Sequence, residues 1–107
     1  VDKYNQEFYA NNLPIYKNNI IILVNSETAS SSEIFSSIMK FYKKAIIVGE
    51  KTFGKGSVQT LVNLNEDNTE AIKITNSILY LPDDTTFHLK GVEADFVISD
   101  KVNKFDT

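Results

Sequence analysis

Apolar blocks alternate with polar stretches over residues 20–49 and predict three regular elements. Residues 20–24 form a continuous run of β-branched and aliphatic side chains, which predicts a strand buried on both faces, as in a parallel sheet. Residues 45–48 repeat this pattern and end at Gly49. Between them, apolar side chains at helical spacing predict a helix over 31–43 with one buried stripe: Ile34, Phe35, Ile38, Met39 and Tyr42. Strand, helix and strand make a βαβ unit with a parallel pair.

The rest of the chain indicates a lead-in and antiparallel strands. Residues 1–19 are rich in Asn, Tyr and Lys and are broken at Pro14, which predicts a short helix followed by a loop. Residues 58–64 and 71–80 flank a turn-rich segment and predict a hairpin. Three short elements are expected after it: a turn at 82–84, a strand over 85–89 and a last strand at 97–98. The predicted fold class is α/β, a βαβ unit plus antiparallel hairpins with its core over 20–98.

The amino-acid composition excludes several classes of function but says less about the fold. The 107 residues make one domain or part of one, and Val1 in place of an initiator Met indicates a chain cut from a longer one. The 11 basic and 14 acidic residues form no basic stripe, so nucleic acid is not an expected partner. The absence of cysteine excludes disulfides and a cysteine nucleophile. No His, Asp and Glu cluster has metal-ligand spacing, so neither a metal nor a cofactor is expected.

Ser30 stands where the first strand leads into the helix, and two interpretations of it remain open. Backbone N–H groups at a helix start are unpaired and favour negative charge, so a nucleophile here would have donors for an oxyanion. Ser30 and Glu33 also match a capping box, in which the serine caps the helix and the glutamate reaches back. Local chemistry alone favours the cap.

A glycine loop follows the second strand. The sequence GEKTFGK at 49–55 matches the first seven positions of a phosphate-binding loop, but Gly56 stands where Mg²⁺ needs Ser or Thr. A strand rather than a helix is expected next, which argues against nucleotide binding. Lys55 is a candidate general base, a role that requires a neutral amine and therefore burial or a nearby cation; the alternative is a solvated loop lysine. In an extended stretch, Gln59 would face the same side as Lys55 and hold its amine.

His88 is the one histidine of the chain. It falls in the predicted strand over 85–89, with Asp84 and Asp95 as candidate partners. A lone histidine on a half-buried strand is more often structural than a base, so a Ser–His–Asp triad is not expected.

Three segments resemble the C-terminal processing (tail-specific) peptidases, a family of serine proteases. They are ILVN at 22–25, TASSSEI at 28–34 and VGEKTFGKGSVQ at 48–59, in the family's order and with Lys55 25 positions after Ser30. The likeness continues more weakly through KGVEAD at 90–95, where Ala94 replaces the usual Pro.

The resemblance implies that Ser30 is the nucleophile, Lys55 the base, Gln59 the residue that orients Lys55, and the Ser31 amide one oxyanion donor. It implies a crotonase-like fold, cleavage of extended protein substrates near their C-termini, and a place outside the cytoplasm, in the cell envelope or secreted. Phe41 departs from the family, other members of which place Asp there. The chain is expected to be the C-terminal half of the catalytic domain, without the PDZ domain and upstream half. It is therefore expected to be inactive alone, and its exposed sheet edges predict a homodimer.

Two other functions stay open. The same fold would serve as a non-catalytic module that binds peptides by strand addition or acts as a scaffold. The glycine loop would make the chain a nucleotide-binding protein, with Mg²⁺-dependent binding that requires Lys55.

Overall fold

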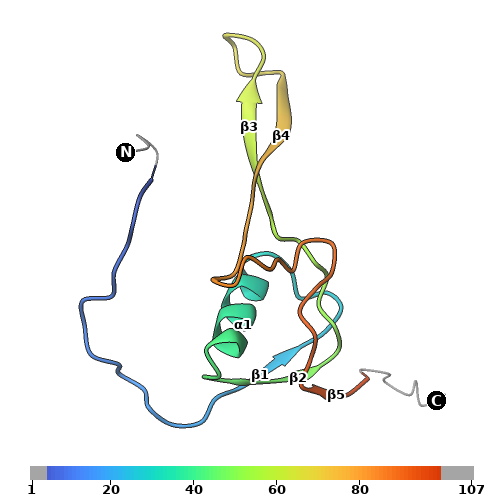
Figure 1. Cartoon of the computed structure of the whole chain (residues 1–107). Coiled ribbons are helices and arrows are strands. Elements are labelled where there is room, and N and C mark those ends of the chain that lie inside the picture. Colours follow the sequence, from blue (N-terminus) through green and yellow to red (C-terminus); the bar gives the residue numbers. More distant parts are fainter. Residues whose placement is uncertain (1–4, 100–107) are drawn as a thin grey trace, which may run out of the picture.

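The computed structural model describes residues 5–99 and confirms the central βαβ unit (Figure 1). Its elements are β1 (Ile21–Val24), α1 (Ser31–Phe41), β2 (Ile46–Gly49), β3 (Ser57–Asn63), β4 (Ala71–Ile78) and β5 (Phe96–Val97). β2 is the middle strand of a three-stranded sheet and pairs in parallel with β1 and β5. Val24 lies opposite Gly49, so β1 and β2 end level with each other. The loops that follow them, one carrying Ser30 and the other Lys55, therefore start side by side.

α1 ends two residues earlier than predicted, at Phe41, because a C-terminal cap stops it. Lys43 adopts a positive φ of 55° and its N–H donates to the Lys40 carbonyl. The Lys44 N–H donates to the Met39 carbonyl. These two bonds make a Schellman motif, which turns the chain sharply toward β2.

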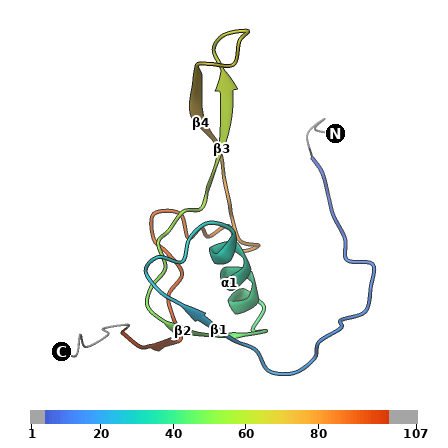
Figure 2. The ribbon, with the colours of Figure 1, turned by 180° about the vertical axis from the view of Figure 1, so that it is seen from behind.

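The predicted hairpin is confirmed as an antiparallel ribbon of β3 and β4 that projects away from the βαβ unit (Figures 1 and 2). Two other predictions are wrong. Residues 85–89 form no strand, because Leu89 has a positive φ of 60° and its N–H donates to the Gly54 carbonyl. The chain thus folds back onto the glycine loop instead of extending. Residues 5–20 contain no helix, and residues 1–4 of that predicted lead-in lie outside the described part.

The expected burial of β1 on both faces and of the apolar stripe of α1 is also wrong, because in β1 only Val24 is buried. Leu23 is 78% exposed and Phe35 is 56% exposed. One helix covers the sheet, so within residues 5–99 the opposite face and the outer side of α1 have nothing to pack against. In the described part of the chain, the buried hydrophobic side chains are Val24, Ile47, Phe87 and Val92. The buried residues of α1 are polar: Glu33, Ser36 and Ser37.

Asp95 fastens the segment that leads into β5 to the centre of the sheet. Its carboxylate accepts the Ile47 N–H at 2.8 Å and pairs with the Lys40 ammonium at 3.1 Å. The Ile47 N–H first, and Lys40 after it, hold the pKa of Asp95 below its usual range.

We expect Asp95→Asn to lower the thermal stability modestly at pH 7, because the ion pair is partly solvated and screened. A carboxyl whose pKa is depressed on folding stabilises the fold above its unfolded pKa of about 3.9, and this contribution is lost as the pH falls through the folded value. The difference in Tm from wild type should be full above about pH 5 and should shrink as the pH falls through the lowered pKa of Asp95. Calorimetry at a series of pH values checks this, with the exposed Asp67→Asn as control. An equal deficit at both ends would contradict it.

Candidate active site

Ser30 sits on a strained turn between β1 and α1. Its φ of 60° and ψ of −122° lie outside the extended backbone of an ordinary N-cap. Such a conformation destabilises a non-glycine residue by about 1–3 kcal/mol, and residues strained in this way are concentrated at functional sites. A sharp, strained turn from strand to helix is also how α/β-hydrolases expose their nucleophilic serine. The strained backbone of Ser30 therefore favours a functional role for this residue in addition to helix capping.

Glu33 connects Ser30 with the glycine loop. Its carboxylate accepts the Ser30 N–H at 2.9 Å, which is the glutamate half of the predicted capping box. The same oxygen, Oε2, accepts the Lys55 N–H at 2.8 Å. The backbone N–H groups of Ser30 and Lys55 thus both donate to the same atom, Glu33 Oε2.

Further backbone contacts hold the two loops together. The Phe53 N–H donates to the Thr28 carbonyl at 2.9 Å, and the Glu50 N–H donates to the Val24 carbonyl at 3.0 Å. Gly54 has a φ of 97°, and a Cβ added there would lie 2.9 Å from the Gly91 nitrogen. Only glycine meets both demands, so Gly54 sets the path of the chain immediately before Lys55.

Three of the predicted site residues line one cavity of about 280 Å³ at the base of the ribbon. Its walls are Ser30, Ile34, Lys55, Ser57, Val58, Gln59, Lys73 and Leu79. The Lys55 residue is exposed rather than buried, so the burial considered for a lysine base is not present in the described residues. Lys73, on β4, lines the same cavity. The Gln59 amide donates to the Thr75 hydroxyl at 3.2 Å, which fixes its position against β4.

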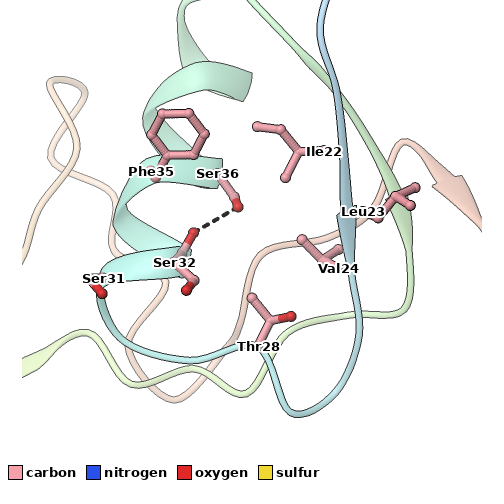
Figure 3. Close-up of a pocket in the computed structure, with 8 residues that line it drawn as sticks. All are labelled: Ile22, Leu23, Val24, Thr28, Ser31, Ser32, Phe35 and Ser36. Carbon is pink, nitrogen blue, oxygen red and sulfur yellow. Dashed lines mark hydrogen bonds between the residues drawn. The ribbon is translucent and has the colours of Figure 1, made fainter.

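Ser31 opens on a neighbouring cavity of about 430 Å³ between α1 and β1 (Figure 3). It is the first residue of α1, where a backbone N–H has no carbonyl one turn earlier to bind. In Figure 3, Ile22 and Phe35 flank this cavity, and the Ser36 hydroxyl donates to the Ser32 carbonyl at 2.7 Å. The structure thus places Ser31 next to Ser30 in the chain but on a different cavity from the one that Lys55 lines.

The alternative sites lack support in the structure. The N–H groups of Gly54 and Lys55, which a phosphate would need, are bound to a carboxylate, and β3 rather than a helix follows. Asp95 is engaged by Ile47 and Lys40, and His88 lies in a turn with its buried Nδ1 unpaired. No three His, Asp or Glu side chains of residues 5–99 are placed to hold a metal ion.

The sequence reasoning missed three residues of this region. Glu33 was expected only as a capping-box partner. Thr52 lies in the glycine loop but was assigned no role, and its hydroxyl donates to Glu33 at 2.5 Å. Lys73 looks like any exposed strand residue. Phe41, where other members of the family have Asp, lines a different cavity together with Phe87 and Val92.

Comparison with known proteins identifies the family. A model of peptidase family S41 matches residues 1–98. The carboxy-terminal-processing protease of Bartonella bacilliformis is 38% identical over 79 residues, and a probable CtpA-like serine protease of Staphylococcus epidermidis is 44% identical over 80. These matches cover 74% and 75% of this chain. The chain belongs to peptidase family S41, a family of proteases.

Solved structures agree with this assignment. The photosystem II D1 C-terminal processing protease matches 77% of this chain with a TM-score of 0.68 and 34% identity. Mature CPAF matches the same share with a TM-score of 0.67 and 25% identity. The chain spans only 18% and 16% of the two curated relatives and 21% and 16% of the two solved chains. No helix of residues 5–99 is long and apolar enough to cross a bilayer.

Proposed function

We propose that this chain supplies the nucleophile and general base of a serine peptidase that works without histidine. The observation that carries the proposal is that Ser30 and Lys55 donate their backbone N–H groups to one Glu33 oxygen and line one cavity. Membership of peptidase family S41 supports the reaction class.

In the proposed mechanism, the neutral Lys55 amine takes the proton of the Ser30 hydroxyl as Oγ attacks a peptide carbonyl carbon. The resulting oxyanion accepts a hydrogen bond from the Ser31 N–H at the start of α1. The Lys55 ammonium returns its proton to the leaving amine, which breaks the peptide bond and leaves an acyl ester on Ser30. Lys55 then deprotonates a water molecule that hydrolyses the ester and regenerates the serine.

Gln59 and Lys73 fit supporting roles in this scheme. Because the Gln59 amide donates to Thr75, its oxygen is the end left to accept from the Lys55 amine. Lys73 lines the same cavity as Lys55 and brings a second positive charge to its wall.

The names of the relatives suggest the substrate class. Two of them are called C-terminal processing proteases, so we propose protein substrates cleaved near their C-termini by a crotonase-like catalytic domain. We propose further that the protein acts outside the cytoplasm and that its open sheet edges support a homodimer.

A fluorophosphonate probe tests the proposal in the whole protein, including any segment that precedes residue 1. Ser30 Oγ should displace fluoride and form a phosphonate ester, which mass spectrometry of peptides will place on Ser30. His88→Asn should label at the wild-type rate, since no histidine takes part. The 107-residue chain alone should label poorly and cleave nothing. An unlabelled Ser30 in the whole protein would refute the peptidase and favour a peptide-binding module.

A further inference from the structure

We propose that Glu33 is a positioning residue that holds the nucleophile and the base in register. The inference rests on the proposed function of Ser30 and Lys55. Glu33 does not contact the substrate in this proposal. Its carboxylate acts through the backbone N–H groups of Ser30 and Lys55, which it joins.

The burial of Glu33 exceeds what a helix cap requires. A capping box needs one bond from the glutamate, and a glutamate in the first turn of a helix usually stays in water. Glu33 is 0% exposed, and burying a carboxylate is costly unless donors replace the lost water. Its two oxygens offer about four acceptor sites, and four donors fill them. Only the Ser30 N–H belongs to the cap.

The other three donors all come from the glycine loop. Oε1 accepts the Thr52 hydroxyl at 2.5 Å and the Gly54 N–H at 2.6 Å. Oε2 accepts the Lys55 N–H beside that of Ser30. Charge-assisted bonds of this kind are short and directional, so one rigid group fixes the separation of the loops that carry Ser30 and Lys55, which lie 25 positions apart in the sequence.

Thr52 extends the network to the C-terminal segment. Its hydroxyl donates to Glu33 while accepting the Val92 N–H at 2.7 Å, so the direction of the hydroxyl hydrogen is determined. The Thr52 N–H donates in turn to the Val92 carbonyl at 3.2 Å. The segment around Val92 is therefore anchored to the same carboxylate as Ser30 and Lys55.

Glu33→Gln tests the proposal with almost no change in shape. Either orientation of the amide turns an NH₂ group toward two donors, so the loops must separate. We expect the rate constant of Ser30 phosphonylation and kcat to fall about 100-fold, the typical loss for a displacement of about 1 Å. KM should stay within about threefold, and saturating probe should still label every molecule.

Thr52 provides a second pair of variants in case Glu33→Gln folds poorly. Thr52→Val removes one donor to Glu33 and keeps the shape, so labelling should slow about tenfold. Thr52→Ser keeps the hydroxyl and should restore the rate to within about twofold. The pair separates the hydroxyl from the volume of the side chain.

The outcomes distinguish this proposal from the proposed function. A wild type that labels, with Glu33→Gln or Thr52→Val reacting at the wild-type rate, would overturn the role of Glu33 and leave the peptidase standing. A lower final labelled fraction at an unchanged rate constant would also overturn it, because that result marks a merely structural residue. A wild type that does not label refutes the peptidase itself.

Discussion

Lys55→Met is expected to lower kcat/KM for peptide cleavage by about 10⁴-fold or more in the whole protein. Methionine keeps most of the length and apolar body of lysine but takes no proton from Ser30. The change leaves the backbone N–H of residue 55 on Glu33, so the loop keeps its position. Ser30→Ala should lower kcat/KM by about 10⁶-fold, as removal of the nucleophile does in subtilisin. Steady-state cleavage of a peptide by purified variants measures both losses.

Lys44→Met is the matched control, because Lys44 is exposed after the end of α1 and does not line the cavity of Ser30. It should cleave the peptide at the wild-type rate. If Lys55→Met also retains turnover, Lys55 is a solvated loop lysine, and another group must activate the serine.

Gly54→Ala is expected to reduce kcat by about 100-fold or more although it changes no reacting group. A Cβ at this position would lie 2.9 Å from the Gly91 nitrogen and 3.1 Å from the Lys90 nitrogen, both of them backbone atoms. The φ of 97° adds conformational strain. The loop must shift, and with it the Gly54 and Lys55 N–H groups that bind Glu33.

Phe53→Leu provides the comparison within the same loop. The Phe53 side chain is exposed, and its N–H bond to the Thr28 carbonyl survives the substitution. Rates of peptide cleavage and of Ser30 labelling should stay near wild type in Phe53→Leu and fall in Gly54→Ala. Equal rates in the two variants would show that the path of the loop does not matter.

The βαβ unit was predictable because its signals are local. An unbroken β-branched run, a helical period and a second such run determine the elements and the parallel pairing. Parallel strands that end level with each other bring their following loops together, so the meeting of the Ser30 and Lys55 loops follows from the pairing of Val24 with Gly49. The spacing of 25 residues would not by itself have shown this.

Burial and long-range hydrogen bonds were not predictable in the same way. The apolar stripe of α1 predicts a buried face, but the side of the helix that packs within residues 5–99 carries Glu33, Ser36 and Ser37. The fold-back at Leu89 depends on a bond to the Gly54 carbonyl 35 residues earlier, which no local pattern encodes. The positive φ of Ser30 is likewise imposed by its surroundings, since serine alone prefers other conformations.

The most direct test of the Ser30–Lys55 pair is kcat/KM for one peptide with Ser30→Ala, Lys55→Met and the double variant. If the two residues act as one unit, removing either of them already removes the contribution of the pair. The kcat/KM of the double variant should therefore lie within about threefold of that of Ser30→Ala. Losses that multiply in the double variant, or a Ser30→Ala protein that still cleaves, would contradict a serine peptidase built on these two residues.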